Sequence, residues 1–322
     1  MAFRAKWIAC LAIMLGASLV LLVAPTYAKP KHVIIAEFNW SGSRIISQIM
    51  KHVLEDRLNV PATVKRLTPA DIWTAMIWGK VDVYSDLWWP NQYEGFRKYV
   101  REEKVVQMTL SYENALQGFV IPTWVSKKHG ITHIEDLKGH TKLFDFNWDG
   151  MGDLWVGESG WMATQINKIK IRSYRLHYQP FVVDNSIFLT FLKETMRARR
   201  PIIFYYWTPS WVFAHYDLTW IEEPTYDPQK WQWGRRYHAR ASITCGYQPA
   251  KVYVAYTKRL KDLIPKAYQF FKNWHIALDE VSALIAEIED VPGNPKKDPA
   301  EVARKWVADH PGSVNGWLRG IE

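Results

Sequence analysis

Tryptophan is the residue whose number and placement suggest chemistry in this chain, with 18 among 322 residues. Trp40 and Trp88 follow predicted strands and Trp207 ends one, while Trp161 lies where a loop meets a predicted helix. Because strand carboxyl ends meet at one crevice in open α/β sheets, the four rings can face a common space. An indole face attracts a desolvated cation by about 0.5–2 kcal/mol, most strongly a quaternary ammonium. The placement predicts an aromatic cage for a methylated cation, with core packing as the alternative for any single ring.

Short apolar runs alternate with helical patterns along most of the chain. The expected strands cover residues 31–37, 62–67, 81–84, 118–122, 154–157, 201–207 and 251–256. The expected helices cover 45–54, 72–76, 162–169 and 186–196, and the tail from 264 is mostly helical. This alternation is typical of α/β folds, whose ligand crevices lie at strand ends. At roughly 150 residues per domain, the length favours two α/β lobes.

The first 28 residues have the three-part pattern of a secretory signal. Arg4 and Lys6 precede an uncharged run over 7–23, and small residues lead up to Ala28. We expect cleavage after Ala28 and export to the periplasm. An uncleaved membrane anchor is the alternative for a run of this length. Cys245 would then be the single remaining cysteine, which excludes an internal disulfide and suits a small buried hydrophobe.

Composition narrows the function classes. The chain is 48% hydrophobic and 23% charged, which excludes disordered and fibrous proteins. The formal net charge is +9, but the basic residues are scattered, with short clusters only at 197–200 and 235–236. Together with export, this scatter argues against a nucleic-acid partner.

Enzyme motifs are largely missing from the sequence. It has no zinc-binding helix motif, no phosphate loop, no nucleophile elbow and no paired cysteines. Glu222 and Glu223 are the best candidates for a paired acid and base, although adjacent carboxylates more often lie on a solvated loop. We therefore expect no enzyme activity, no cofactor and no metal site.

Several stretches, in order along most of the chain, carry a resemblance to a known family. They are residues 38–41 (Phe-Asn-Trp-Ser), 86–92 (Asp-Leu-Trp-Trp-Pro-Asn-Gln), 117–122 (Gln-Gly-Phe-Val-Ile-Pro), 160–161 (Gly-Trp) and 206–213 (Tyr-Trp-Thr-Pro-Ser-Trp-Val-Phe). With these motifs the chain resembles the substrate-binding proteins of ABC importers for glycine betaine, proline betaine and choline.

The resemblance implies a type II two-lobed α/β clamp with its ligand cleft between the lobes. It places the signal at 1–28, the first lobe at 29–121 and 223–322, and the second lobe at 122–222. It also implies a monomeric receptor that binds a betaine-like ligand and delivers it to a membrane permease, with no nucleic acid involved. The implied ligand contacts are Trp40, Trp88 and Trp207 in an aromatic box, Trp161 against the ligand, and polar contacts from Ser41 and Ser43; Gln117 is a further candidate contact from its own chemistry.

Two positions depart from the choline-binding members of the family. Those members carry a box tyrosine where this chain has Gln117, and an acid where it has Gly42. A betaine is therefore favoured over choline, and Gln117 can donate to a carboxylate or bond to the backbone around it. The alternatives are a receptor for another zwitterion or an amino acid such as proline or histidine, an exported hydrolase that uses the tryptophans for stacking, and a sensory domain.

Overall fold

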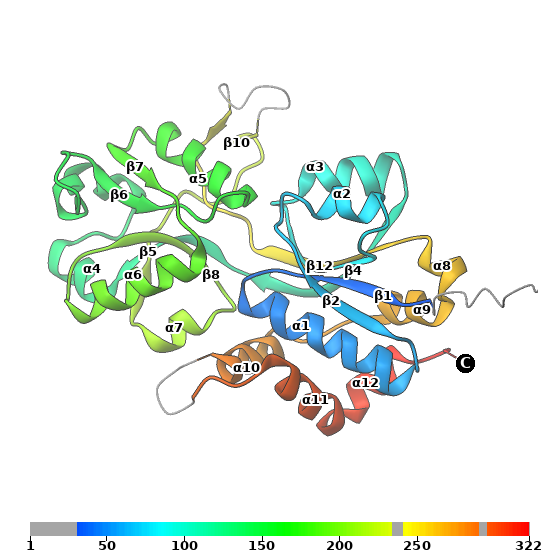
Figure 1. The fold of residues 1–322 in the computed structure, drawn as a ribbon. Coiled ribbons are helices and arrows are strands. Elements are labelled where there is room, and N and C mark those ends of the chain that lie inside the picture. The colour runs from blue at the N-terminus through cyan, green and yellow to red at the C-terminus, as the bar shows by residue number, and fades with distance from the viewer. Residues whose placement is uncertain (1–30, 234–240, 290–294, 322) are drawn as a thin grey trace, which may run out of the picture. The chain divides into compact units, whose positions relative to one another are not determined.

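The computed structural model describes residues 31–233, 241–289 and 295–321. The predicted signal segment and its cleavage site lie outside the described residues. Two five-stranded sheets dominate the described chain (Figure 1). Both are mixed, and both follow one strand pattern.

The first sheet has the order β2-β1-β3-β12-β4. Its strands are β1 (Val33–Glu37), β2 (Ala62–Arg66), β3 (Val83–Trp89), β4 (Val106–Ala115) and β12 (Ala250–Thr257). β1 pairs in parallel with β2 and β3, while β12 runs antiparallel to both β3 and β4. The carboxyl ends of β1 and β3 therefore lie at the same edge of the sheet.

The second sheet repeats this arrangement with the order β7-β6-β8-β5-β9. Its strands are β5 (Gln117–Pro122), β6 (Gly152–Trp155), β7 (Tyr178–Phe181), β8 (Ile203–Trp207) and β9 (Leu218–Trp220). β6 pairs in parallel with β7 and β8, and β5 is antiparallel to its two neighbours. By position in the pattern, β6 and β8 correspond to β1 and β3.

The chain crosses between the sheets twice. β4 ends at Ala115 and β5 begins at Gln117, so the first crossing lies between these two strands. β5 joins the second sheet because its buried backbone pairs with β8 and β9. The return follows β9, and the short pair β10 (Trp231–Gln232) and β11 (Ser242–Ile243) packs beside the second sheet's helix α5.

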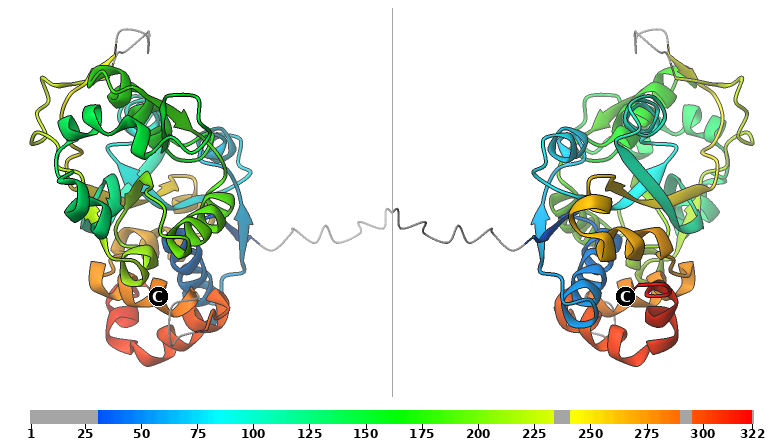
Figure 2. Two further views of the ribbon diagram at one scale, coloured as in Figure 1. Left: turned by 90° about the vertical axis from the view of Figure 1, so that its left-hand side faces the viewer. Right: turned by 90° about the vertical axis from the view of Figure 1, so that its right-hand side faces the viewer.

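Helices cover the sheets. Those of the first sheet are α1 (Ser41–His52), α2 (Ile72–Ile77), α3 (Tyr93–Gly95), α8 (Leu260–Leu263), α9 (Pro265–Asn273), α10 (Leu278–Ile288), α11 (Pro299–Asp309) and α12 (Pro311–Trp317), with π-helical segments η1 (Val53–Arg57) and η2 (Phe96–Glu102). Those of the second sheet are α4 (Thr123–His129), α5 (Met162–Ser173), α6 (Asn185–Arg197) and α7 (Trp211–His215), with 3-10 turns η3 (Ile134–Gly139) and η4 (Thr141–Leu143). α11 lies beside α1 in Figures 1 and 2.

The alternation of β1 shows how the core positions the site. Val33 and Ile35 point to the helical side, where they join a cluster with Ile45 and Ile49 of α1. Ala36 faces the other way, into a second cluster that also contains buried residues of the second sheet. Since this second cluster includes three of the four candidate cage tryptophans and has Trp88 packed against it, the site is built on core residues of both sheets.

Candidate functional site

The four candidate tryptophans occupy matching positions in the two sheets. Trp40 is the N-cap of α1, the helix after β1, and Trp161 is the N-cap of α5, the helix after β6. Trp88 lies near the end of β3, and Trp207 is the last residue of β8. Each sheet thus contributes one tryptophan at a helix start and one at a strand end, which is where parallel strands present residues to a crevice.

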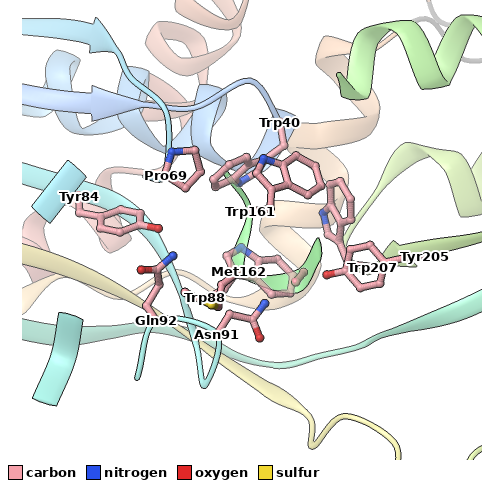
Figure 3. Close-up of a pocket in the computed structure, with 11 residues that line it drawn as sticks. Trp40, Pro69, Tyr84, Trp88, Asn91, Gln92, Trp161, Met162, Tyr205 and Trp207 are labelled. Atoms are coloured by element: carbon pink, nitrogen blue, oxygen red, sulfur yellow. The ribbon is translucent and has the colours of Figure 1, made fainter. Parts of the chain in front are cut away.

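All four rings line a single cavity. Figure 3 shows the lining side chains turned toward a common space. The lining consists of Trp40, Pro69, Tyr84, Trp88, Asn91, Gln92, Trp161, Met162, Ala163, Tyr205 and Trp207. Six of these residues are aromatic, and the polar side-chain groups are two amides, two phenol hydroxyls and the indole N–H groups of the tryptophans. Such a surface offers ring faces to a cation and few competing hydrogen bonds.

The wall from the first sheet is held by a buried carboxylate. The Asp86 Oδ2 atom accepts hydrogen bonds from Nε1 of Trp40 and from Nε1 of Trp88, the latter at 3.2 Å. The Tyr112 hydroxyl donates to Oδ1 at 2.9 Å. Burial raises the pKa of Asp86, and the three donated hydrogen bonds oppose that rise. Phe38 stacks on the back of Trp40 at 4.8 Å between ring centroids, so both ring position and tilt are fixed.

The wall from the second sheet is held by aromatic contacts. Trp207 stacks on Tyr206 with ring centroids 4.4 Å apart. The Trp161 ring stands edge-on to Trp207 at 5.3 Å and to Trp40 at 5.9 Å, so it touches tryptophans of both sheets. Nε1 of Trp161 is buried and has no hydrogen-bond partner among the described residues. The Trp161 residue lines the cavity, while its Nε1 atom has almost no accessible surface.

Gln117 lies behind the lining and supports it. Its Oε1 atom accepts hydrogen bonds from Asn91 Nδ2 at 2.9 Å and from the Tyr205 hydroxyl at 2.8 Å. Asn91 and Tyr205 line the cavity, whereas Gln117 is absent from the lining. From the sequence, Gln117 was expected either to donate to a ligand carboxylate or to bond to the backbone around it. In the structure its side-chain oxygen is bonded instead to side chains from both sheets.

The two serines are placed differently from each other. Ser43 is fully buried, and its Oγ accepts the backbone N–H of Phe38 at 2.9 Å and lies 3.2 Å from Ser85 Oγ. Ser41 Oγ donates to Glu289 at 2.7 Å and borders a second cavity, which also touches Trp40 and Trp207. Neither serine lines the tryptophan cavity.

The only acid pair with a catalytic interpretation is divided between two environments. Glu222 is exposed and lies 3.2 Å from His133, while Glu223 forms a 2.6 Å ion pair with the buried Lys170. Neither glutamate lines the tryptophan cavity. Among the described residues there is also no cluster of side chains that could hold a metal ion.

Tyr84, Asn91, Tyr205 and Asp86 were not predicted as site residues from the sequence. Asn91 and Asp86 flank the Trp-Trp-Pro motif, and Tyr205 lies two residues before Trp207, so proximity to the motifs was the available signal. Burial raises the pKa of both Tyr84 and Tyr205. Their hydroxyls therefore stay protonated at neutral pH, and the site contains no phenolate.

A family model decides the class of this protein. The model for the substrate-binding domain of the ABC-type glycine betaine transport system (OpuAC) matches residues 31–309. The chain belongs to this family. The prediction of a solute-binding protein rather than an enzyme is thereby confirmed.

Individual relatives agree with the family assignment. The glycine betaine/carnitine transport binding protein GbuC of Listeria monocytogenes is 27% identical over 164 residues, half of this chain and 46% of its own length. The chain therefore aligns with about half the length of this relative. The glycine betaine/proline betaine-binding periplasmic protein of Escherichia coli is 22% identical over 71% of this chain and 70% of its own length.

Solved structures show the same fold. Lactococcal OpuAC, in its closed form with glycine betaine, superposes with a TM-score of 0.70 at 21% identity, covering 90% of this chain and all of that one. A choline-binding protein of an ABC transporter, in complex with choline, gives a TM-score of 0.73 at 19% identity, covering 91% and 93%. The predicted α/β fold, a two-lobed binding protein of type II, is confirmed.

Proposed function

We propose that this OpuAC-family protein binds a quaternary ammonium compound of the glycine betaine or proline betaine type and delivers it to the membrane permease of an ABC importer. One observation carries the proposal: tryptophans at matching positions of the two sheets line one cavity. A quaternary ammonium has no N–H and cannot donate a hydrogen bond through its nitrogen, so ring faces are its best partners in a protein.

Different residues of the cavity would bind the two charged groups of the ligand. Trp40, Trp88 and Trp207 would surround the methylated head, and Trp161 Nε1 would donate to its carboxylate. A micromolar dissociation constant corresponds to about 8 kcal/mol, which a few cation–π contacts and a hydrogen-bonded carboxylate can supply after the costs of association. Ser41 and Ser43, which the family resemblance implies as polar contacts, and Gln117, a candidate contact from its own chemistry, act in this proposal by supporting the residues around the cavity.

The ligands of the relatives support the choice of ligand class. They bind glycine betaine, carnitine or proline betaine, and one solved neighbour holds choline. We favour a betaine over choline here because Gln117 and Gly42 replace a tyrosine and an acid of the choline-binding members. Proline and histidine lack the quaternary ammonium head that fills an aromatic cage.

The proposal includes the protein's location and assembly. We propose export to the periplasm with cleavage after Ala28, and action as a monomer without a nucleic-acid partner. Periplasmic relatives support export. Within residues 31–233, 241–289 and 295–321, no helix has the length and apolar character needed to span a bilayer. We also propose that the two sheets mark the two lobes of a clamp, with the second lobe beginning near Gln117.

Calorimetric and tryptophan-fluorescence titrations of the mature protein test the function. The ligands are glycine betaine, proline betaine, choline, carnitine, proline and histidine. We expect saturable binding of glycine betaine or proline betaine, with a fluorescence change because the ligand contacts the indoles. Binding of proline or histidine without any methylated ligand, or no binding of any of the six, would contradict the proposal.

A further inference from the structure

Asp86 is a buried carboxylate in contact with two of the rings that line the cavity. It has no exposed surface and lies on β3, two residues before Trp88. Trp40 and Trp88 both donate to the same oxygen, Oδ2, although they come from different elements of the first sheet. A single side chain thus fixes the edges of two cage rings.

The hydrogen bonds of Asp86 favour its ionised form and oppose the rise in its pKa that burial causes. Indole N–H groups donate and cannot accept, so a proton on Oδ2 would compete with both rings for the lone pairs of that oxygen. Oδ1 receives the hydroxyl of Tyr112 at 2.9 Å. The network presents three donors to the carboxylate, which matches the acceptor capacity of an anion.

No cation of the described chain balances this charge. None of the ion pairs found within residues 31–233, 241–289 and 295–321 includes Asp86. Buried charges in proteins are normally paired, because an isolated one loses its hydration without compensation. The missing positive charge is the one that a quaternary ammonium would bring to the adjoining cavity.

Gly42 leaves room for this carboxylate. A Cβ atom at position 42 would lie 3.4 Å from Asp86 Oδ2 and 3.7 Å from the Tyr112 hydroxyl oxygen. Both are ordinary van der Waals distances, so position 42 lies directly against the network. An acid at this position, as in choline-binding members, would also place a second negative charge beside Asp86.

We propose that Asp86 is a positioning residue that also sets the charge selectivity of the cavity, holding Trp40 and Trp88 while its negative charge favours a cationic head over a neutral head of the same shape. The inference rests on the proposed function and adds its charge-selecting group. The carboxylate acts through the indoles: by accepting their N–H hydrogen bonds it increases the electron density of the ring faces. It also adds a long-range attraction in a site that contains little water.

A pair of ligands of equal shape separates the charge effect from a purely structural effect. Glycine betaine and 3,3-dimethylbutanoate differ only in the head, which carries a quaternary nitrogen in one and a quaternary carbon in the other. Calorimetry would measure both affinities in the wild type, in Asp86→Asn and in Tyr112→Phe. Asp86→Asn keeps the size and an acceptor oxygen but removes the charge, whereas Tyr112→Phe removes a hydrogen bond to the same carboxylate and keeps the charge. Thermal unfolding would show that each variant is folded.

We expect Asp86→Asn to lower the preference for glycine betaine over 3,3-dimethylbutanoate by about tenfold or more, and Tyr112→Phe to change it by less than about threefold. An unchanged preference in Asp86→Asn, whether both ligands weaken or neither does, would overturn the inference. If the neutral-headed ligand binds too weakly to measure, an equal loss of glycine betaine affinity in both variants would overturn it, and a much larger loss in Asp86→Asn would support it. A wild-type protein that binds no glycine betaine would overturn the proposed function itself.

Discussion

Two aromatic clusters of this protein are built from the same chemical groups but differ in where their cation comes from. In the second sheet's half, the ammonium of Lys170 lies 4.3 Å from the ring centroid of Tyr247, 5.6 Å from Phe119 and 5.8 Å from Trp231. Its counter-ion is Glu223, with 2.6 Å between Nζ and Oε2. The tryptophan cavity also has aromatic rings and a buried carboxylate, Asp86, but the described chain places no cation there.

The source of the cation separates a structural role for one cluster from a ligand-binding role for the other. The cluster around Lys170 carries its cation covalently, so it is complete in every copy of the protein and ties α5 to the segment after β9. In the proposed function, the cluster around Asp86 is completed only by a ligand, which makes it a binding site. This fold therefore holds, at Lys170, a buried ammonium that is surrounded by aromatic rings and paired with a carboxylate.

Removing the internal cation is the change with the largest expected effect. Lys170→Met should lower the free energy of unfolding by about 3–5 kcal/mol, because the Glu223 carboxylate would stay buried without its partner. Burial already lowers the pKa of Lys170, and the attraction of Glu223 opposes that shift. Denaturant unfolding of the mature protein measures the loss, and calorimetry should show nearly unchanged glycine betaine affinity in the folded variant.

The matched control is the double variant Lys170→Met with Glu223→Gln. It removes both charges together, so it should recover part of the lost stability. If the single variant is as stable as the wild type, or if the double variant is less stable than the single one, the pair does not stabilise this cluster as described.

Removing a ring from the tryptophan cavity should abolish binding while the fold remains. We expect Trp88→Ala and Trp207→Ala each to weaken glycine betaine binding beyond detection, at least about 100-fold, because each loses a ring face and admits water to the cage. Titration measures the affinity, and far-UV circular dichroism checks the fold. Trp148→Ala is the control, since Trp148 is 89% exposed and does not line the cavity. Normal affinity in either cavity variant would remove that tryptophan from the proposed cage.

The parts of the fold that follow from local pattern were predictable from the sequence. The apolar runs at β1, β8 and β12 give strands because their residues are buried, and the spacing of Ile45, Ile46 and Ile49 gives α1. β4 was missed because its residues, Val106–Ala115, mix polar and apolar types and are only half-buried along much of their length. These residues are extended because they pair with β12, and that pairing cannot be read from the neighbouring sequence.

The site was predictable where its residues end strands, and not where they meet through space. The four tryptophans follow from their positions, and the structure brings them to one cavity. The contact of Asp86 with Trp40 joins residues 46 positions apart, and that of Gln117 with Tyr205 joins residues 88 positions apart. Ser43 is a similar case, since only the fold shows that its hydroxyl is taken up by Phe38 and Ser85.

The smallest expected effect concerns the unpaired donor on the second wall. The first wall's indoles, Trp40 and Trp88, give their N–H groups to Asp86, whereas Nε1 of Trp161 is buried without a partner among the described residues. If this N–H donates to the ligand's carboxylate, Trp161→Phe should weaken glycine betaine binding at least about tenfold, the lower end of what a hydrogen bond to a charged group contributes. The phenyl ring keeps an aromatic face, so the cage for the cationic head should remain.

Tetramethylammonium provides the comparison that makes Trp161→Phe informative. It has the methylated head and no acceptor, so calorimetry should give nearly equal affinities for it in the wild type and the variant. A parallel loss for both ligands would mean that Trp161 contributes its ring face alone, as the other three tryptophans do. A loss confined to glycine betaine would instead assign different roles to the indole N–H groups of the two sheets. Those of Trp40 and Trp88 in the first sheet fix two of the rings that receive the cation by bonding to Asp86. That of Trp161 in the second sheet would bind the ligand's own carboxylate.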